Sequence, residues 1–135
     1  MSLDPHLAAH ALGAAGDAII TLDGSAKVTS WNDAAERLLG FTRDEAFAHG
    51  LALIIPAEYV PRHVAGFRAA MNGGHLAHGG AVARVEATTK SGGRLALGLS
   101  LGLLPGGDGR PAGVVGVLRP LGDAAVEFVT KGQGG

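Results

Sequence analysis

Histidines are the side chains of this 135-residue chain whose chemistry needs examining first, because the sequence contains six of them and no cysteine. Without a thiol, the chain has no disulfide, no zinc–thiolate site and no cysteine nucleophile. His6 and His10 are spaced so that they would share one face of a helix, where a pair of imidazoles could capture a metal ion. Two exposed histidines more often lie in water, so we predict no metal site there.

The remaining histidines differ in their surroundings. His75 and His78 lie in a glycine-rich segment, where no helix holds them on one face and no third ligand is near in sequence. We interpret these two, and His49, as solvated loop residues. His63 lies within a stretch of helical periodicity, and it is the remaining candidate for a binding role.

Sequence motifs of the common enzyme classes are missing. The chain has no Gly-x-Ser-x-Gly elbow, no phosphate loop ending in Gly-Lys-Ser/Thr and no metalloprotease helix. Its glycine clusters flank predicted hairpins instead of strand-to-helix phosphate turns. We therefore expect no catalytic residues and interpret the protein as a non-enzyme.

Length and charge limit the possible partners. A chain of 135 residues can bury a single core, and its formal net charge of -1 provides no basic face for nucleic acid and no polybasic segment for an anionic membrane. The N-terminus lacks a signal-peptide pattern, and no apolar run approaches the roughly 20 residues that a membrane span needs. We expect a cytoplasmic protein that binds neither nucleic acid nor membrane.

Periodicity predicts the elements that must position His63. Asp4-Pro5 is a good helix start, Asn32 or Asp33 can cap a second helix that Gly40 ends, and Thr42 with Glu45 forms a capping box. Apolar residues recur at helical spacing from Ala57 to Asn72, with Pro61 in the first turn. Alternation and β-branched content predict strands over residues 18–22, 27–31, 81–89, 94–103 and 112–118.

One predicted strand has a distinctive alternation. From Leu95 to Leu103 every odd position is leucine, and the even positions are small residues. One face of this strand should pack inward, while the other is covered by something thin. We therefore expect a strand in the interior of a sheet and not at its edge.

The order of these elements and several local motifs resemble the PAS domain, a sensory fold. The resemblance covers residues 17–121 and is carried by Trp31-Asn32, Ala34-Ala35-Glu36, Leu38, Gly40-Phe41-Thr42 and Glu45, with support from Ile55-Pro56 and Lys90-Ser91-Gly92. It implies an α+β fold, in which helices cover one face of a five-stranded antiparallel sheet. Residues 1–16 would form an N-terminal flanking helix, and residues 122–135 a linker, with a short helix around 124–128, and a tail.

The resemblance also implies roles for individual residues. A carboxylate at Glu36 would pair with Lys90 and tie the helical corner to a sheet hairpin. The segment around His63 is similar to haem-binding PAS oxygen sensors, in which a histidine on this helix is the axial ligand of haem b. Arg84 lies near the place where an arginine contacts bound gas or a propionate, although one position away. A cysteine-linked flavin or chromophore is excluded by composition.

Three functions remain open from the sequence. The first is a sensor that binds an apolar small molecule between the long helix and the sheet, and the second is a haem-based gas or redox sensor through His63. The third is a ligandless dimerisation module. In each case we expect a homodimer that signals through its terminal helices to an effector such as a kinase or a transcription regulator. The predicted pocket residues are Leu53, Val64, Phe67, Leu97, Leu99, Leu101 and Val115.

Overall fold

A computed structural model describes residues 4–74, 76 and 82–121 of the chain. Our predictions for His75 and His78, and for a linker helix after Leu121, lie outside these described residues. Helix predictions at the N-terminus and in the middle of the chain, and all five predicted strands, fall largely within them.

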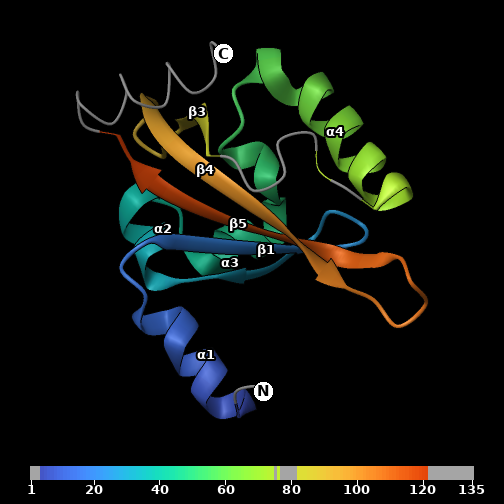
Figure 1. Ribbon diagram of the computed structural model, residues 1–135. Helices are drawn as coiled ribbons and strands as arrows, with labels where there is room; N and C mark the ends of the chain where they lie inside the picture. The colour runs from blue at the N-terminus through green and yellow to red at the C-terminus, as the bar shows by residue number, and fades with distance from the viewer. Residues whose placement is uncertain (1–3, 75, 77–81, 122–135) are drawn as a thin grey trace.

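The architecture is a five-stranded antiparallel sheet with helices packed against it, as predicted (Figure 1). The strands lie in the order β2-β1-β5-β4-β3, so that the first and last strands of the sequence are neighbours. The leucine-rich strand, β4, lies in the interior of the sheet as predicted, because it pairs with β5 on one side and with β3 on the other. The strand bounds are β1 Ala18–Asp23, β2 Val28–Trp31, β3 Ala83–Thr88, β4 Arg94–Pro105 and β5 Pro111–Pro120.

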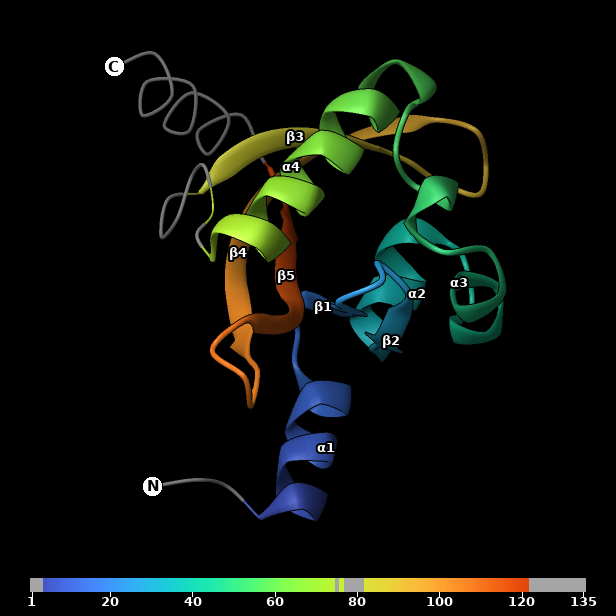
Figure 2. The ribbon, with the colours of Figure 1, turned by 90° about the vertical axis from the view of Figure 1, so that its right-hand side faces the viewer.

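The helices begin and end close to the predicted positions. They are α1 Pro5–Ala14, α2 Asp33–Leu39, α3 Arg43–His49 and α4 Val60–Gly73, with short 3-10 turns η1 Leu51–Leu53 and η2 Ala57–Tyr59. The long predicted helix starts as η2 and becomes α-helical at Val60, since Pro61 fits in the first turn, where its missing N–H has no helical partner to lose. Helix α1 projects away from the sheet (Figures 1 and 2).

Local capping explains the α2 and α3 boundaries. The Asn32 side chain accepts a hydrogen bond from the Ala35 amide, and Gly40 ends α2 in a left-handed conformation with φ of 86°. The Thr42 side chain and the Glu45 carboxylate then satisfy each other's backbone amides, so the predicted capping box is confirmed. Two consecutive short helices therefore follow directly from the hairpin.

Strand register divides the sheet into two faces. Leu99 is opposite Leu118 of β5 and Ala83 of β3, and Leu118 is in turn opposite Ala18 of β1. Directly opposed residues point to the same side of an antiparallel sheet, so these residues share the face that packs against the helices. We call it the inner face. The fully buried side chains Trp31, Leu39 and Leu97 mark the core between this face and the helices.

Among the described residues, no helix is both long and apolar enough to cross a membrane.

Candidate ligand site

Helix α4 turns His63 toward the sheet. The less exposed residues of α4 recur at helical spacing, at Val60, His63, Phe67 and Ala70, and Phe67 packs against the core. Val64, which we predicted to line the pocket, is 41% exposed and lies toward the margin of this stripe. The His63 imidazole therefore lies on the inward side of the helix, whereas the side chain of Val64 does not.

Partial burial sets the charge state of this imidazole. Desolvation lowers the pKa of His63 from its ordinary value of 6.5, because the charged form loses hydration when the ring is half-buried. The neutral ring is therefore favoured at neutral pH. A neutral imidazole can donate one hydrogen bond, accept another, or bind a metal centre through its free nitrogen.

Among the inner-face leucines of β4, exposure is highest at Leu101. Leu97 is fully buried and Leu99 packs partly against the core, whereas Leu101 is 36% exposed. Gly116 of β5 is opposite Leu101, and a methyl group at position 116 would lie 3.4 Å from Leu99 Cδ1. The large apolar side chain of Leu101 is thus accessible on the face that carries the core, and its neighbour Gly116 has no side chain to cover it.

Four of the predicted pocket residues lie together at the core and two at its margin. Leu53, Phe67, Leu97 and Leu99 belong to the core or pack against it. The more exposed residues are Val64 on α4 and Leu101 on β4.

Val115 and Arg84 do not belong to this group, which corrects the sequence interpretation. Val115 is opposite Thr21 and Gly102, and Arg84 is opposite Gly98. These positions alternate with the inner-face leucines, so both side chains start from the outer face of the sheet. Because Arg84 is displaced by one position along the strand, its side chain starts from the face of the sheet opposite to a ligand that is held under α4.

The predicted pair between Glu36 and Lys90 is also wrong. Lys90 Nζ lies 2.7 Å from Glu45 Oε2, and the Glu36 carboxylate accepts a hydrogen bond of 2.7 Å from the Arg43 amide. Lys90, followed by the Thr42 amide, holds the pKa of the Glu45 carboxyl below its ordinary value of 4.5. The link between the helical corner and the β3–β4 hairpin exists as expected, but the first turn of α3 provides its carboxylate.

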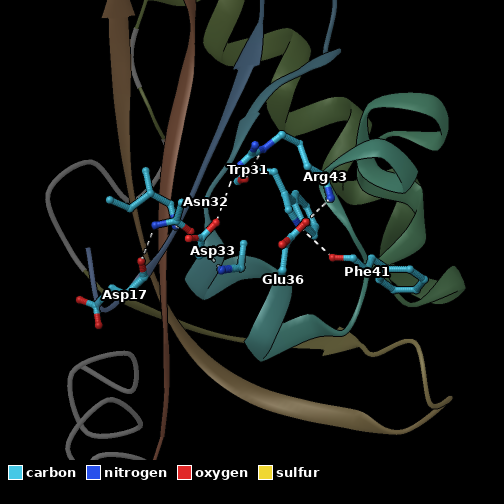
Figure 3. A network of polar contacts seen from close by, with 9 residues as sticks. Asp17, Trp31, Asn32, Asp33, Glu36, Phe41 and Arg43 are labelled. Atoms are coloured by element: carbon cyan, nitrogen blue, oxygen red, sulfur yellow. Dashed lines mark hydrogen bonds and ion pairs between the residues drawn. The ribbon is translucent and has the colours of Figure 1, made fainter. Parts of the chain in front are cut away.

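The corner around Trp31 is held by polar contacts that the sequence motif did not reveal individually. Trp31 Nε1 donates to the Phe41 carbonyl at 3.0 Å, and Arg43 Nε donates to the Trp31 carbonyl at 3.0 Å (Figure 3). The Asn32 side chain accepts from the Ile19 amide and donates to the Asp17 carbonyl. These hydrogen bonds therefore join β1, β2, α2 and α3 on one side of the candidate site.

A second group of contacts fixes the start of α4. Arg94, at the beginning of β4, forms two hydrogen bonds of 2.7 Å with the Glu58 carboxylate, and Tyr59 donates a longer one of 3.5 Å to Glu86. The Arg94 contact is the main cause that lowers the pKa of Glu58. Sequence reasoning missed both contacts, because the partners lie 27 and 36 residues apart. Turn η2 is thus tied to the sheet immediately before α4 begins.

The open clefts of the described surface include two that His63 does not line. The larger, of about 520 Å³, lies between the end of α4 and the β4–β5 hairpin, and Asp108 and Arg110 contribute its charged groups. The smaller, of about 290 Å³, lies between α2 and the ends of β1 and β5, beside Arg37. Within the described residues, no group of three or more acidic or histidine side chains could hold a metal ion.

Comparison with known proteins agrees with this architecture. A family model described as the PAS fold matches residues 7–121. The chain therefore belongs to the PAS family, and the earlier resemblance is confirmed. No curated protein sequence matches it.

Solved structures give the same fold. A PAS domain of a protein from Colwellia psychrerythraea is 17% identical, with a TM-score of 0.72 over 86% of this chain and 95% of the other. An RNA-binding light-oxygen-voltage receptor is 20% identical, with a TM-score of 0.73 over 94% of this chain and 37% of the other. A domain of a sensory box sensor histidine kinase/response regulator from Geobacter sulfurreducens is 25% identical, with a TM-score of 0.61 over 84% and 91% of the two chains. These similarities establish the fold of a sensory domain that is common in signalling proteins.

Proposed function

We propose that this PAS domain is a sensory module that binds an apolar small molecule between α4 and the inner face of the sheet. The observation that carries this proposal is the 36% exposure of Leu101 on a face that is otherwise core. A leucine left accessible beside Gly116 offers apolar area that a ligand can remove from water, at about 25 cal/mol per Å². The half-buried His63 supplies one polar group that can orient such a ligand.

The arrangement of α4 suggests how binding is transmitted. Its start is tied to the sheet through Glu58 and Arg94, while its inward stripe buries a single residue, Ala70, completely. A ligand under the helix would therefore shift the α4 backbone relative to β4 and β5 more easily than it would shift the Trp31 corner. Strand β5 carries this change to the chain leaving the domain, and from there to an effector such as a kinase or transcription regulator.

A pair of substitutions tests the site with an uncharged fluorescent hydrocarbon, diphenylhexatriene. Leu101→Glu places a carboxylate on the inner face, whereas Ser100→Glu places the same group on the outer face one residue away. We expect saturable binding to the wild type and to Ser100→Glu, and at least about a tenfold weaker binding to Leu101→Glu. Equal binding by the two variants, with both folded by circular dichroism, would reject a site under α4.

Haem is the second candidate ligand, and the neutral, half-buried imidazole of His63 favours it. His63 fits the role of axial donor, and the apolar residues Leu99 and Leu101 fit the environment of a porphyrin. Arg84 does not fit the role of a gas or propionate contact, because it lies on the outer face. Bound haem would supply reversible coordination of a diatomic gas or a redox change.

Haem reconstitution separates the two candidates. If His63 is the axial ligand, the purified protein mixed with haemin develops a Soret absorption that His63→Ala shifts or removes. A spectrum that matches free haemin, or one that His63→Ala leaves unchanged, rejects haem. A protein that binds neither haemin nor diphenylhexatriene, and co-purifies with no small molecule by native mass spectrometry, would be a ligandless dimerisation module.

A further inference from the structure

The outer edge of β3 has no strand beside it over Arg84 to Glu86 among the described residues. Strand β3 ends the sheet, and within the described residues it pairs on one side, with β4. The Thr88 amide points away from β4, because it donates to the Ile54 carbonyl at 2.8 Å. Backbone groups of alternate residues point the same way along a strand, so Arg84 and Glu86 present their amides and carbonyls at the open edge.

The charges along this edge are self-complementary in one register. Arg84 and Glu86 flank Val85, and both side chains lie on the outer face of the sheet. When two copies of the strand run antiparallel about a two-fold axis through Val85, each Arg84 lies opposite the Glu86 of the other copy. The outward-pointing residues are then the ones that meet, so each pair can exchange both backbone hydrogen bonds.

We infer that two copies of this chain associate through the outer edges of β3, in the register centred on Val85, and form one continuous antiparallel sheet. An isologous contact of this kind needs a single self-complementary surface. No described residue forms an ion pair with Arg84, and Glu86 is engaged by the 3.5 Å contact from Tyr59. The Tyr59 contact uses Oε1 of Glu86, so Oε2 can still accept a hydrogen bond from the Arg84 guanidinium of a second copy.

Neighbouring registers are opposed by charge. An axis through Arg84 would place two guanidinium groups opposite each other, and an axis through Glu86 would do the same with two carboxylates. Like charges directly opposite destabilise a strand pair. The second of these registers would also bring Arg84 of one copy against Thr88 of the other, whose amide is already used by Ile54, whereas the register centred on Val85 brings only Val82, which precedes the strand, to that position.

The same hydrogen bond to Ile54 limits the length of the contact. The backbone of Ile54 occupies the edge of β3 beside Thr88. Strand pairing between two copies can therefore extend over little more than Arg84, Val85 and Glu86. A contact of this size falls in the class of weak interfaces below about 1,200 Å². The dimer should therefore form and dissociate with protein concentration.

Charge reversal tests the register directly by sedimentation equilibrium at several concentrations. Arg84→Glu and Glu86→Arg each place like charges opposite each other in a homodimer, so each should weaken self-association at least about tenfold. Mixing the two variants restores opposite charges at both pairs, and the mixture should form a heterodimer. The double variant Arg84→Glu/Glu86→Arg should dimerise as the wild type does.

Lys27→Glu, an equal charge change in the exposed turn between β1 and β2, is the matched control and should leave association unchanged. The inference is overturned if the wild type is monomeric at every concentration, if the single variants dimerise as strongly as the wild type, or if the mixture fails to form heterodimers. Melting temperatures of all variants distinguish lost association from lost folding.

Discussion

His63 illustrates how a single position on a helix decides between core and site. The helix places the imidazole on its inward stripe, and Val64, the more apolar neighbour, becomes 41% exposed. Burial of a titratable ring beside accessible apolar area costs stability whenever the ring must take up a proton. This cost makes the residue measurable even before a ligand is identified.

The stability of the protein should depend on pH through His63. Because its folded-state pKa lies below 6.5, the unfolded chain binds the proton more readily as pH falls below that value. The free energy of unfolding should therefore decrease as the pH falls through 6.5, and this decrease should end once the pH is below the folded-state pKa of His63. Urea unfolding at several pH values should show this decrease for the wild type and a smaller one for His63→Gln. Equal pH dependence of the two proteins would contradict the burial of the ring.

Asn32 is the buried polar side chain on which the Trp31 corner depends. It is 4% exposed and accepts from the Ile19 and Ala35 amides while it donates to the Asp17 carbonyl. Asn32→Ala would leave these groups without their partner, so we expect a loss of about 2–4 kcal/mol in the free energy of unfolding. Asn32→Ser keeps a capping oxygen and should lose less. Denaturant titrations measure both, and equal losses would show that capping contributes nothing.

At the scale of elements, Gly40 lets the end of α2 approach the β3–β4 hairpin. Its φ is 86°, and a methyl group there would lie 3.1 Å from Lys90 Cβ. The same approach allows the Lys90 amide to donate to the Leu39 carbonyl at 3.0 Å. A side chain at this position must therefore adopt a strained backbone and also push against the hairpin.

Two glycine substitutions separate these effects. Gly92 has a similar φ of 93°, but a methyl group at position 92 would meet nothing within 4 Å. Gly92→Ala should cost the backbone strain alone, about 1 kcal/mol, whereas Gly40→Ala should cost about 2 kcal/mol or more. Thermal unfolding of the two variants checks the difference. If Gly92→Ala is as destabilising as Gly40→Ala, the contact with Lys90 carries no weight.

The elements were predictable from the sequence because their signals are local. Caps at Asn32 and Thr42, the leucine alternation of β4 and the placement of Pro61 each depend on residues a few positions apart. The site was less predictable, because it depends on register and on distant partners. Whether Val115 lines the pocket depends on the register of β5 against β4, which places it on the outer face. Lys90 could pair with Glu36 or with Glu45 at the same corner, and it pairs with Glu45. Spacing along the chain contains neither piece of information.

Across the whole molecule, burial is concentrated away from α4. Helix α2 buries Ala34, Ala35 and Leu39 within seven residues, whereas α4 buries Ala70 within 14. Local opening is easiest where few apolar side chains are buried. The candidate ligand is therefore expected to bind at a boundary of the domain where few side chains are buried.

Hydrogen exchange should reveal this uneven stability. We expect the amides in the C-terminal half of α4 to exchange faster than those of β1 and β5, because the sheet opens with the whole domain and the helix does not. A bound apolar molecule should slow exchange in α4 more than in α2. Uniform protection across the helices and the sheet would contradict a mobile boundary.

The pairing of β1 with β5 also has a mechanical consequence. Ala18 is opposite Leu118, and Asp17 lies 2.6 Å from Arg119 just outside that pair. Because the strands are antiparallel, the chain enters and leaves the sheet at the same end of one ladder. A pull that separates the two connections loads one ion pair and then one hydrogen bond after another, as a zipper opens, instead of shearing the ladder as a whole. Tension between the flanking segments should thus first break the Asp17–Arg119 ion pair and the hydrogen bonds at this end of the sheet, and a low force should suffice.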